Sequence, residues 1–148
     1  MAEKSTRRMD VTLIDGMHFQ ATGKNNVSVS IDSSHDDGGV SSGPTPMELM
    51  LVALGGCTGM DVISILRKKR QDVTAYRVEV TGTVSDDFPH VYTHIAIRHV
   101  VVGNGISDEA VRHAIELSET KYCGAHAMLK QATEMTTSYE TGPARASD

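Results

Sequence analysis

Residues 43–70 read GPTPMELMLVALGGCTGMDVISILRKKR, and this stretch decides the fold. Thr45, Pro46 and Glu48 mark a helix start, because a Thr N-cap, a proline at the first helical position and a Glu three residues after the cap form a capping box. Residues 49–54 are apolar with no polar face, which predicts burial of the first half of the helix. The second half turns amphipathic and ends on a basic run, which suits the negative end of the helix dipole. The sequence therefore predicts one long central helix.

Three short strands are predicted before this helix. Residues 11–14 and 17–22 flank an Asp-Gly turn at 15–16, a pattern typical of a β-hairpin. Residues 27–31 alternate apolar and polar side chains, as a half-buried strand does. A loop rich in Ser, Gly and Asp, residues 33–44, then leads into the helix.

The chain after the helix is predicted to form two long strands, two helices and a last strand. Residues 76–84 and 91–101 show the strand alternation, and Ser107 is the candidate N-cap of the next helix. Residues 122–130 suit a short separate helix and residues 134–139 a strand. Strand pairs separated by helices indicate an α+β fold with antiparallel sheets.

Length and composition limit the classes of protein. A chain of 148 residues suits one domain, predicted here over residues 9–140 between flexible ends at 1–8 and 141–148. The net charge of -5 and the pI of about 5.8 argue against a nucleic-acid or anionic-membrane partner. The longest strongly apolar run, residues 49–54, falls short of the roughly 20 residues of a membrane helix, and no signal peptide is evident. We therefore expect a cytoplasmic protein.

Cys57 and Cys123 are the only cysteines, and a structural disulfide is not expected in a cytosolic chain. Cys57 lies in an apolar helix, where a cysteine is usually a small buried side chain. Cys123 lies at a helix junction near His126, and a neighbouring imidazolium lowers the pKa of a thiol. The two thiols suit a nucleophile and a resolving group, but their spacing does not show whether the sulfurs meet.

The stretch 43–62, the two long strands, the helix after them and the pair Tyr122-Cys123 together resemble the OsmC/Ohr family, above all its YhfA-like branch. The resemblance covers about residues 11–139. It implies an OsmC-like fold in a cytoplasmic, intertwined homodimer, in which two central helices pack between sheets built from both subunits. It also implies peroxidase chemistry: organic hydroperoxides or hydrogen peroxide oxidise one cysteine to a sulfenic acid, the second cysteine condenses with it, and a lipoyl or other dithiol reduces the disulfide.

By this resemblance Cys57 matches the peroxidatic cysteine and Cys123 the resolving one. The peroxidase members carry a Glu directly after the proline and an Arg in the N-terminal hairpin turn. In this sequence Met47 occupies the position directly after the proline, and Glu48 lies one residue further on. Residues 14–17, the turn of the predicted hairpin, contain no Arg. The pair that activates the thiolate in the peroxidases therefore has no visible counterpart.

Two further side chains are candidates for the catalytic site. Glu48 is either a substitute carboxylate near Cys57 or only the capping-box partner of Thr45. It lies about 180° around the helix from Cys57, so the two side chains do not meet within one helix. A dimer would be needed to bring Glu48 to the site of the other subunit. His126 either stabilises the Cys123 thiolate or is a helix-surface histidine. The residues expected to line an apolar substrate site are Met47, Met50, Leu54 and Met60.

No metal and no cofactor are expected from the motifs. His90 and His94 share a strand face but lie roughly 13 Å apart, too far to share a zinc ion, and His99 points to the opposite face. Gly55, Gly56 and Gly59 lie inside the predicted helix, where they either allow close backbone packing between two central helices or mark a helix break.

Three functions stay open. The first is a thiol-dependent peroxidase in which Cys57 attacks an organic hydroperoxide and Cys123 resolves the product. The second is a non-catalytic dimeric binding or sensor module that holds a small lipophilic or thiol-reactive ligand in the dimer cleft. The third makes both cysteines core residues without chemistry.

Overall fold

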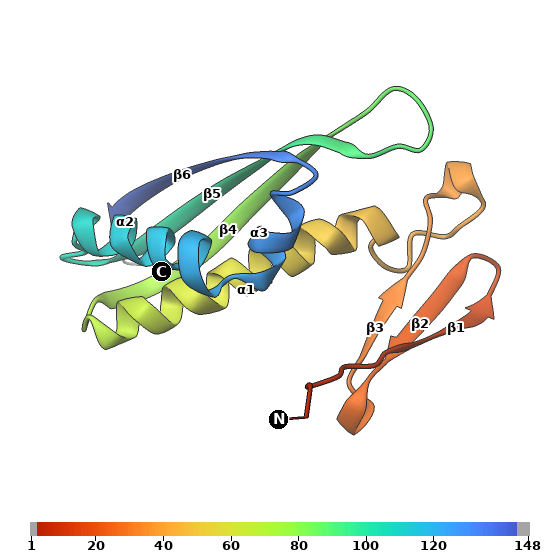
Figure 1. The fold of residues 1–148 in the computed structure, drawn as a ribbon, viewed down its shortest axis with the longest axis horizontal. Helices are drawn as coiled ribbons and strands as arrows, with labels where there is room; N and C mark the ends of the chain where they lie inside the picture. The colour runs from red at the N-terminus through yellow and green to blue at the C-terminus, as the bar shows by residue number, and fades with distance from the viewer. Residues whose placement is uncertain (1–2, 145–148) are drawn as a thin grey trace. The chain divides into compact units, whose positions relative to one another are not determined.

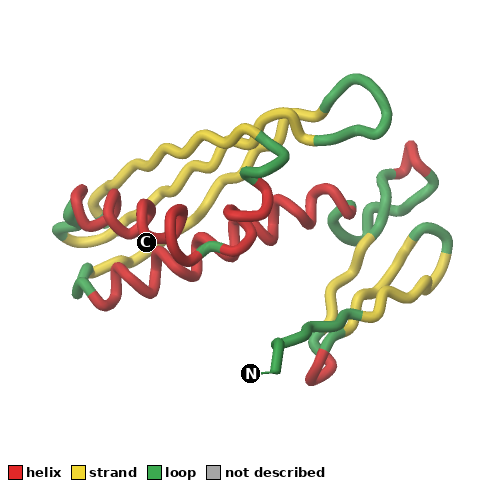
Figure 2. The backbone as a smooth tube through the Cα atoms, viewed as in Figure 1, coloured by secondary structure: helices red, strands yellow, loops and turns green. Residues whose placement is uncertain are grey.

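The computed structural model describes residues 3–144 (Figures 1 and 2). The strands are β1 (Asp10–Asp15), β2 (His18–Thr22), β3 (Ser28–Ile31), β4 (Asp72–Val84), β5 (Tyr92–Asn104) and β6 (Glu134–Pro143). The helices are α1 (Pro46–Lys68), α2 (Asp108–Leu117) and α3 (Gly124–Leu129), with single turns η1 (Lys24–Asn26), η2 (His35–Asp37) and η3 (Ser118–Tyr122). The chain separates into two compact units, one ending at Met50 and one beginning at Leu51.

The first unit is an antiparallel sheet in the order β1-β2-β3, as the sequence predicts. A buried carboxylate, Asp32, organises the loop that follows it. Asp32 accepts hydrogen bonds from the Ser42 hydroxyl at 2.7 Å and from the backbone N–H groups of Ser42, Ser33 and Val40. Those hydrogen bonds, the Ser42 hydroxyl first, lower the pKa of Asp32 to about 2. The loop predicted to be irregular is thus tied together around one charge.

The helix α1 begins as predicted. The Glu48 N–H donates to Thr45 Oγ1 at 3.2 Å, and the Thr45 N–H donates to Glu48 Oε1 at 3.3 Å, which confirms the capping box. The helix then runs unbroken to Lys68, so the alternative of a helix break at the glycines is wrong.

The second unit is a three-stranded sheet in the order β4-β5-β6. β4 and β5 form the predicted long antiparallel pair. β6 lies parallel to β5, which corrects the expectation of antiparallel sheets only. The physical reason is the connection: the chain leaves β5 through α2, η3 and α3, and a helical crossover returns it in the same direction.

The helices α1, α2 and α3 all lie on one face of this sheet (Figure 1). Leu66 of α1 packs in one buried cluster with Val101 of β5 and Val111 of α2. The other face of the sheet is polar, and Arg98 there forms ion pairs with Glu79 at 2.7 Å and with Glu140 at 2.5 Å. The alternation predicted for β4 and β5 therefore separates a core face from a charged face.

The glycines of α1 allow close packing within one chain. A Cβ atom on Gly55 would lie 3.0 Å from the Val80 side chain, and one on Gly59 would lie 3.4 Å from Val78. Both valines belong to β4, so small residues on the helix let β4 approach its backbone. This contact accounts for two of the glycines without a second subunit.

The length and composition of α1 suffice to cross a membrane, with a mean hydropathy of 1.9 over its most apolar window. The expectation that no segment reaches this length is therefore wrong. The same helix supplies buried side chains to the core, namely Leu54, Thr58, Val62 and Leu66. Of residues 49–54, however, Leu54 alone is buried, while Met50 and Val52 are exposed, so the predicted burial of the first half of the helix is wrong within one chain.

The ends of the chain differ slightly from the expected flexible tails. β6 extends to Pro143, so residues 141–143 belong to a strand. Arg8 forms an ion pair with Asp10 at 2.7 Å. Residues 1–2 and 145–148 lie outside the described residues. The prediction of a single domain over residues 9–140 stays a prediction.

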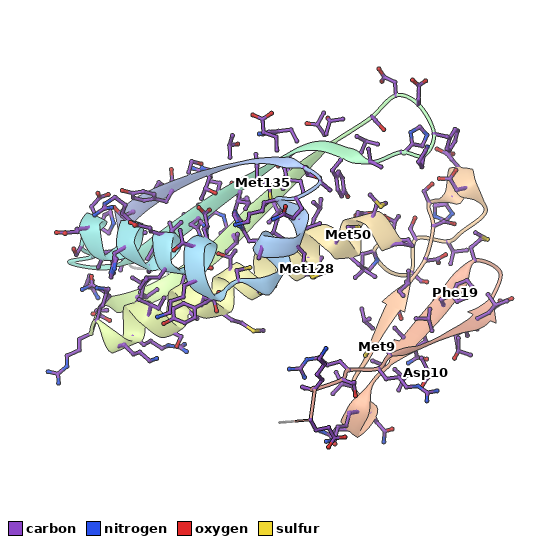
Figure 3. All side chains as sticks on the ribbon, in the orientation of Figure 1. Met9, Asp10, Phe19, Met50, Met128 and Met135 are labelled. Atoms are coloured by element: carbon purple, nitrogen blue, oxygen red, sulfur yellow. The ribbon has the colours of Figure 1, made fainter. Side chains whose placement is uncertain are left out.

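Several large apolar side chains are exposed in both units (Figure 3). Val11 and Leu13 on β1 are each more than half exposed. Met60 on α1 is 74% exposed and Met128 on α3 is 78% exposed. On β1 all six residues are exposed.

Candidate active site

Cys57 lies in the middle of α1, where the helix packs under the sheet. Its neighbours Leu54 and Thr58 are fully buried, and Cys57 itself is half-buried. The position follows from the helix: the buried face repeats every four residues through Leu54, Thr58 and Val62, and Cys57 lies beside that face.

Cys123 lies at the junction between η3 and α3. Its backbone N–H donates to the Ser118 carbonyl oxygen at 2.8 Å, which closes the preceding turn. Its sulfur accepts a hydrogen bond from the backbone N–H of His126 at 3.3 Å and so caps the short helix α3. The side chain is buried, with 3% of its surface exposed.

The fold brings the two cysteines together. The Sγ atoms of Cys57 and Cys123 and a carboxylate oxygen of Asp61 all lie within 4.8 Å of one another. The sequence alone does not give the distance between the two sulfurs, since 66 positions separate the two cysteines. A disulfide between the sulfurs needs a movement of only about 3 Å, because the S–S bond is about 2.05 Å long.

Asp61 is the residue that the sequence reasoning misses. The Ser118 hydroxyl donates to Asp61 Oδ2 at 3.0 Å, and the Thr58 hydroxyl lies 2.8 Å from Ser118 Oγ. Because Ser118 gives its one proton to Asp61, Thr58 donates to Ser118. The signal was available in the sequence: Asp61 follows Cys57 by four residues, which places both on one face of a helix.

The electrostatics of the site distinguish the two thiols. Burial raises the pKa of the Cys123 thiol to about 11, and the neighbouring Cys57 and Asp61 add to the rise. At neutral pH Cys123 is therefore a protonated thiol. Since only a thiolate attacks readily, this favours Cys57 over Cys123 as the first nucleophile.

A second polar pair, Tyr76 and His99, lies on the core face of the sheet. The Tyr76 hydroxyl is 2.7 Å from His99 Nδ1. Burial lowers the pKa of His99 to about 4 and, with the Asp61 charge, raises the pKa of Tyr76. Neutral His99 therefore accepts from Tyr76 through Nδ1 and carries its proton on Nε2, a buried atom without a hydrogen-bond partner in the described chain.

A cleft of about 380 Å³ opens onto the Asp61 side chain. Apolar side chains line part of this cleft, namely Ile65, Leu117 and Tyr122. Lys68 and Lys69 add two ammonium groups to the lining. Asp61, Ile65 and Lys68 recur along one face of α1, so the cleft follows the helix from Asp61 toward its basic end.

Comparison with known proteins bears on this arrangement. A family model described as OsmC-like protein matches residues 35–138, which include both cysteines and Asp61. The chain belongs to the OsmC-like protein family. This OsmC-like protein is 37% identical over 130 residues to Protein YhfA of Escherichia coli (strain K12), across 88% of this chain and 94% of YhfA. The resemblance stated from the sequence is thereby confirmed.

Solved structures share the fold of this OsmC-like protein. A hypothetical protein from Aquifex aeolicus VF5 has a TM-score of 0.84 at 29% identity, over 96% of this chain and 100% of that one. An organic hydroperoxide resistance protein OsmC from Legionella pneumophila has a TM-score of 0.64 at 8% identity, over 93% and 99%. The predicted OsmC-like α+β fold is confirmed, and family membership supports a redox-related stress protein.

The other predicted catalytic residues are held by different contacts. The Glu48 carboxylate is exposed and accepts from the Thr45 N–H in the capping box. In the His126 ring, Nε2 lies 3.9 Å from Glu119 Oε1. The other ring nitrogen, Nδ1, is buried and has no hydrogen-bond partner among residues 3–144. The hydrogen bond from His126 to the Cys123 sulfur comes from its backbone N–H. The carboxylate beside the cysteines is therefore Asp61.

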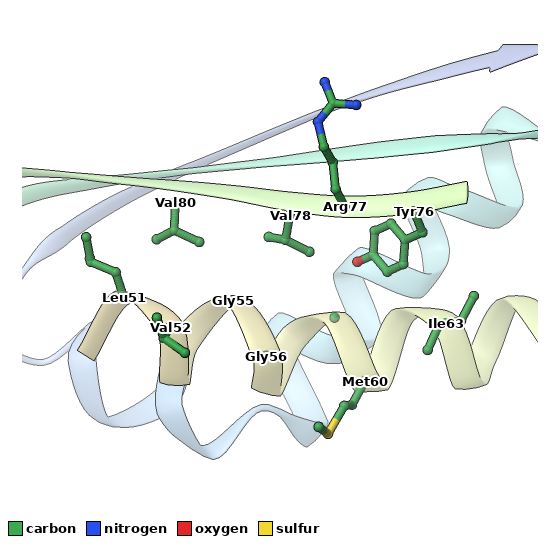
Figure 4. Close-up of a pocket in the computed structure, with 11 residues that line it drawn as sticks. Leu51, Val52, Gly55, Gly56, Met60, Ile63, Tyr76, Arg77, Val78 and Val80 are labelled. Atoms are coloured by element: carbon green, nitrogen blue, oxygen red, sulfur yellow. The ribbon is translucent and has the colours of Figure 1, made fainter. Parts of the chain in front are cut away.

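The four residues expected to bind substrate occupy different environments. Leu54 is fully buried in the core, Met47 is half-buried and Met50 is 40% exposed. Met60 lines a groove of about 570 Å³ between α1 and β4 (Figure 4). In this groove Val78 and Val80 point from β4 toward α1. The groove and the cleft at Asp61 share no lining residue, and the cysteines line neither of them.

The histidines expected to bind no metal have hydrogen-bond partners of their own. His90 Nδ1 lies 2.9 Å from the Ser85 carbonyl oxygen, and His94 Nε2 lies 3.0 Å from Thr136 Oγ1. Within residues 3–144 the one group of three residues that offers converging metal ligands is formed by the cysteines and Asp61.

Replacing Ser118 by alanine is expected to lower the free energy of unfolding by about 1–3 kcal/mol, because Asp61 loses its donor and Thr58 its acceptor in a buried network. Urea denaturation monitored by circular dichroism measures the change. Ser64→Ala is the control, since Ser64 is an exposed serine on α1. Equal denaturation midpoints for the two variants would contradict the network.

Proposed function

We propose that this protein is a thiol-dependent hydroperoxide reductase in which Cys57 is the peroxidatic cysteine and Cys123 the resolving one. The single observation that carries the proposal is the meeting of two sulfurs from distant segments within 4.8 Å. The high pKa of Cys123 supports the order of events, because a protonated thiol suits the second step better than the first.

The first step consumes the hydroperoxide. The Cys57 thiolate attacks one peroxide oxygen, the O–O bond breaks, and the alkoxide takes up a proton and leaves as the alcohol. The sulfur is oxidised to a sulfenic acid, and the hydroperoxide is reduced. The cleft beside Asp61 is the proposed route of entry, and the apolar part of its lining, Ile65, Leu117 and Tyr122, suits an organic substrate.

The second step forms the disulfide. The Cys123 sulfur attacks the Cys57 sulfenic acid, the S–O bond breaks, and the hydroxyl leaves as water with the Cys123 proton. A dithiol reductant then exchanges with the disulfide and restores two thiols while it becomes a disulfide itself. The name of the similar Legionella protein, an organic hydroperoxide resistance protein, favours this substrate class.

We also propose that the working form is a cytoplasmic homodimer. The exposed apolar side chains of both units, such as Leu13 on β1 and Met60 on α1, favour burial against a second copy. Light scattering that gives the mass of a single chain, 15.9 kDa, would contradict the dimer.

Stoichiometric oxidation tests the chemistry. Addition of one equivalent of cumene hydroperoxide to the reduced protein is expected to remove both thiols rapidly and to lower the intact mass by two hydrogen atoms, about 2 Da per chain. Free-thiol counting and intact mass spectrometry read the two quantities. Two thiols that survive unchanged for about an hour, far longer than a poised thiolate needs, would overturn the proposal.

A second candidate function is ligand binding without turnover. The groove between α1 and β4 favours it, because the groove is large and lined by apolar residues such as Leu51, Ile63 and Val78. Surviving thiols in the oxidation experiment would therefore direct attention to a small lipophilic ligand in this groove.

A further inference from the structure

The cluster of Cys57, Asp61 and Cys123 has the composition of a metal site. Its three potential ligand atoms lie within 4.8 Å of one another, and they come from one turn of α1 and from the start of α3. Around a tetrahedral Zn²⁺, bond lengths of about 2.0–2.3 Å separate neighbouring ligand atoms by roughly 3.5–3.8 Å. Small side-chain rotations suffice to reach that separation.

The donor set selects the kind of metal. Two sulfur ligands and one carboxylate oxygen suit a thiophilic divalent ion such as Zn²⁺, whereas Mg²⁺ and Ca²⁺ require oxygen ligands. Three protein ligands leave one tetrahedral position open, which is typical of reactive rather than purely structural zinc sites. Because Asp61 lines the cleft, the open position would face the cleft.

Hydrogen bonds around the cluster orient two of the three proposed ligands, Asp61 and Cys123. Ser118 donates to Asp61 Oδ2 at 3.0 Å, which fixes the carboxylate and leaves Oδ1 available. The backbone N–H of His126 donates to the Cys123 sulfur at 3.3 Å. Hydrogen bonds of this kind orient the ligands of metal sites and stabilise their negative charge.

The cluster also lacks a cation of its own. Asp61 forms no ion pair within residues 3–144, and the His126 ring pairs with Glu119 instead. Lys68 lies seven residues further along α1, about 10 Å away along the helix axis. Binding of a divalent ion would displace the thiol protons, including that of Cys123, and would neutralise the charges that converge in the cluster.

We propose that the reduced protein binds one thiophilic divalent cation, such as Zn²⁺, through Cys57, Asp61 and Cys123. The site does not depend on the hydroperoxide reaction, since it needs only the reduced thiols and the carboxylate. A bound ion would hold both sulfurs at once and shield them from oxidants, so metal and hydroperoxide would compete for the same atoms.

Cobalt titration of the reduced full-length chain tests the site. One equivalent of Co²⁺ is expected to produce thiolate-to-cobalt charge-transfer absorption, and one equivalent of Zn²⁺ is expected to remove it. X-ray absorption of the zinc-loaded wild-type protein is expected to show two sulfur neighbours. A zinc spectrum with only oxygen and nitrogen neighbours would overturn the proposal without reference to any variant.

Variants locate the ion. Cys57→Ser and Cys123→Ser are expected to lose the charge-transfer absorption. Asp61→Asn is expected to weaken zinc affinity at least as much as the loss of an outer-shell partner does, that is by about 10–100-fold or more. Asp86→Asn, which changes an exposed carboxylate in the turn before β5, is expected to bind as the wild type does. Equal affinities of Asp61→Asn and Asp86→Asn would contradict the assignment of Asp61. The metal titration uses no hydroperoxide, so its outcome is independent of the oxidation experiment.

Discussion

Replacing Cys57 by serine is expected to lower hydroperoxide turnover by at least about a thousandfold, because a serine hydroxyl is almost never deprotonated at neutral pH and does not attack the O–O bond. The assay follows consumption of cumene hydroperoxide with an excess of a dithiol reductant. The site around Cys57 is otherwise kept, since serine has nearly the shape of cysteine, and Leu54 and Thr58 still fix this turn of α1.

Cys123→Ser is the informative partner of this experiment. This variant keeps Cys57, so one equivalent of hydroperoxide is expected to convert Cys57 to a sulfenic acid. Dimedone traps the sulfenic acid, and mass spectrometry detects the adduct. Arg67→Ala, an exposed change on the same helix at a residue that does not line the cleft at Asp61, serves as the control with wild-type turnover. If Cys57→Ser kept wild-type turnover, the assignment of the peroxidatic cysteine would be wrong.

Replacing Leu66 by alanine is expected to lower the free energy of unfolding by about 2–5 kcal/mol. Leu66 is fully buried where α1 meets Val101 of β5 and Val111 of α2, so the shorter side chain leaves a cavity between three elements. Chemical denaturation of the reduced protein measures the loss. The effect is large relative to the whole stability of a domain, which is typically about 5–15 kcal/mol.

Arg67→Ala supplies the matched control for Leu66→Ala. Arg67 is the next residue of α1 and is exposed, so its removal is expected to change stability by no more than about 0.5 kcal/mol. A similar loss in both variants would mean that the effect comes from the helix end rather than from the core. A loss below about 1 kcal/mol for Leu66→Ala would contradict the packing described here.

The sequence predicts those parts of the fold that depend on neighbouring residues. The capping box of Thr45 and Glu48, the hairpin at Asp15-Gly16 and the alternation of β4 and β5 are local patterns, and the structure confirms all three. The direction of β6 depends on how the chain returns through α2 and α3. Local alternation carries no information on that direction, so the parallel pairing with β5 was not predicted.

The candidate site could be predicted only in part for the same reason. Cys57 and Cys123 were identified as a pair from the family resemblance, but their contact requires η3 and α3 to dock beside α1. Asp61 was within reach of sequence reasoning through its spacing from Cys57. Ser118 was not, because nothing in its own neighbourhood along the chain points to Asp61.

The closeness of Cys57 and Cys123 has a kinetic consequence. Two groups fixed side by side in a folded protein react as if each were present at a very high local concentration, and well-oriented pairs reach effective molarities of about 10⁵ M or more. A small thiol such as glutathione, free in solution, meets an oxidised Cys57 only by collision. Cys123 is already within 4.8 Å of it. When an oxidant converts Cys57 to a sulfenic acid, we therefore expect the disulfide with Cys123 to form before a thiol from solution reacts with Cys57.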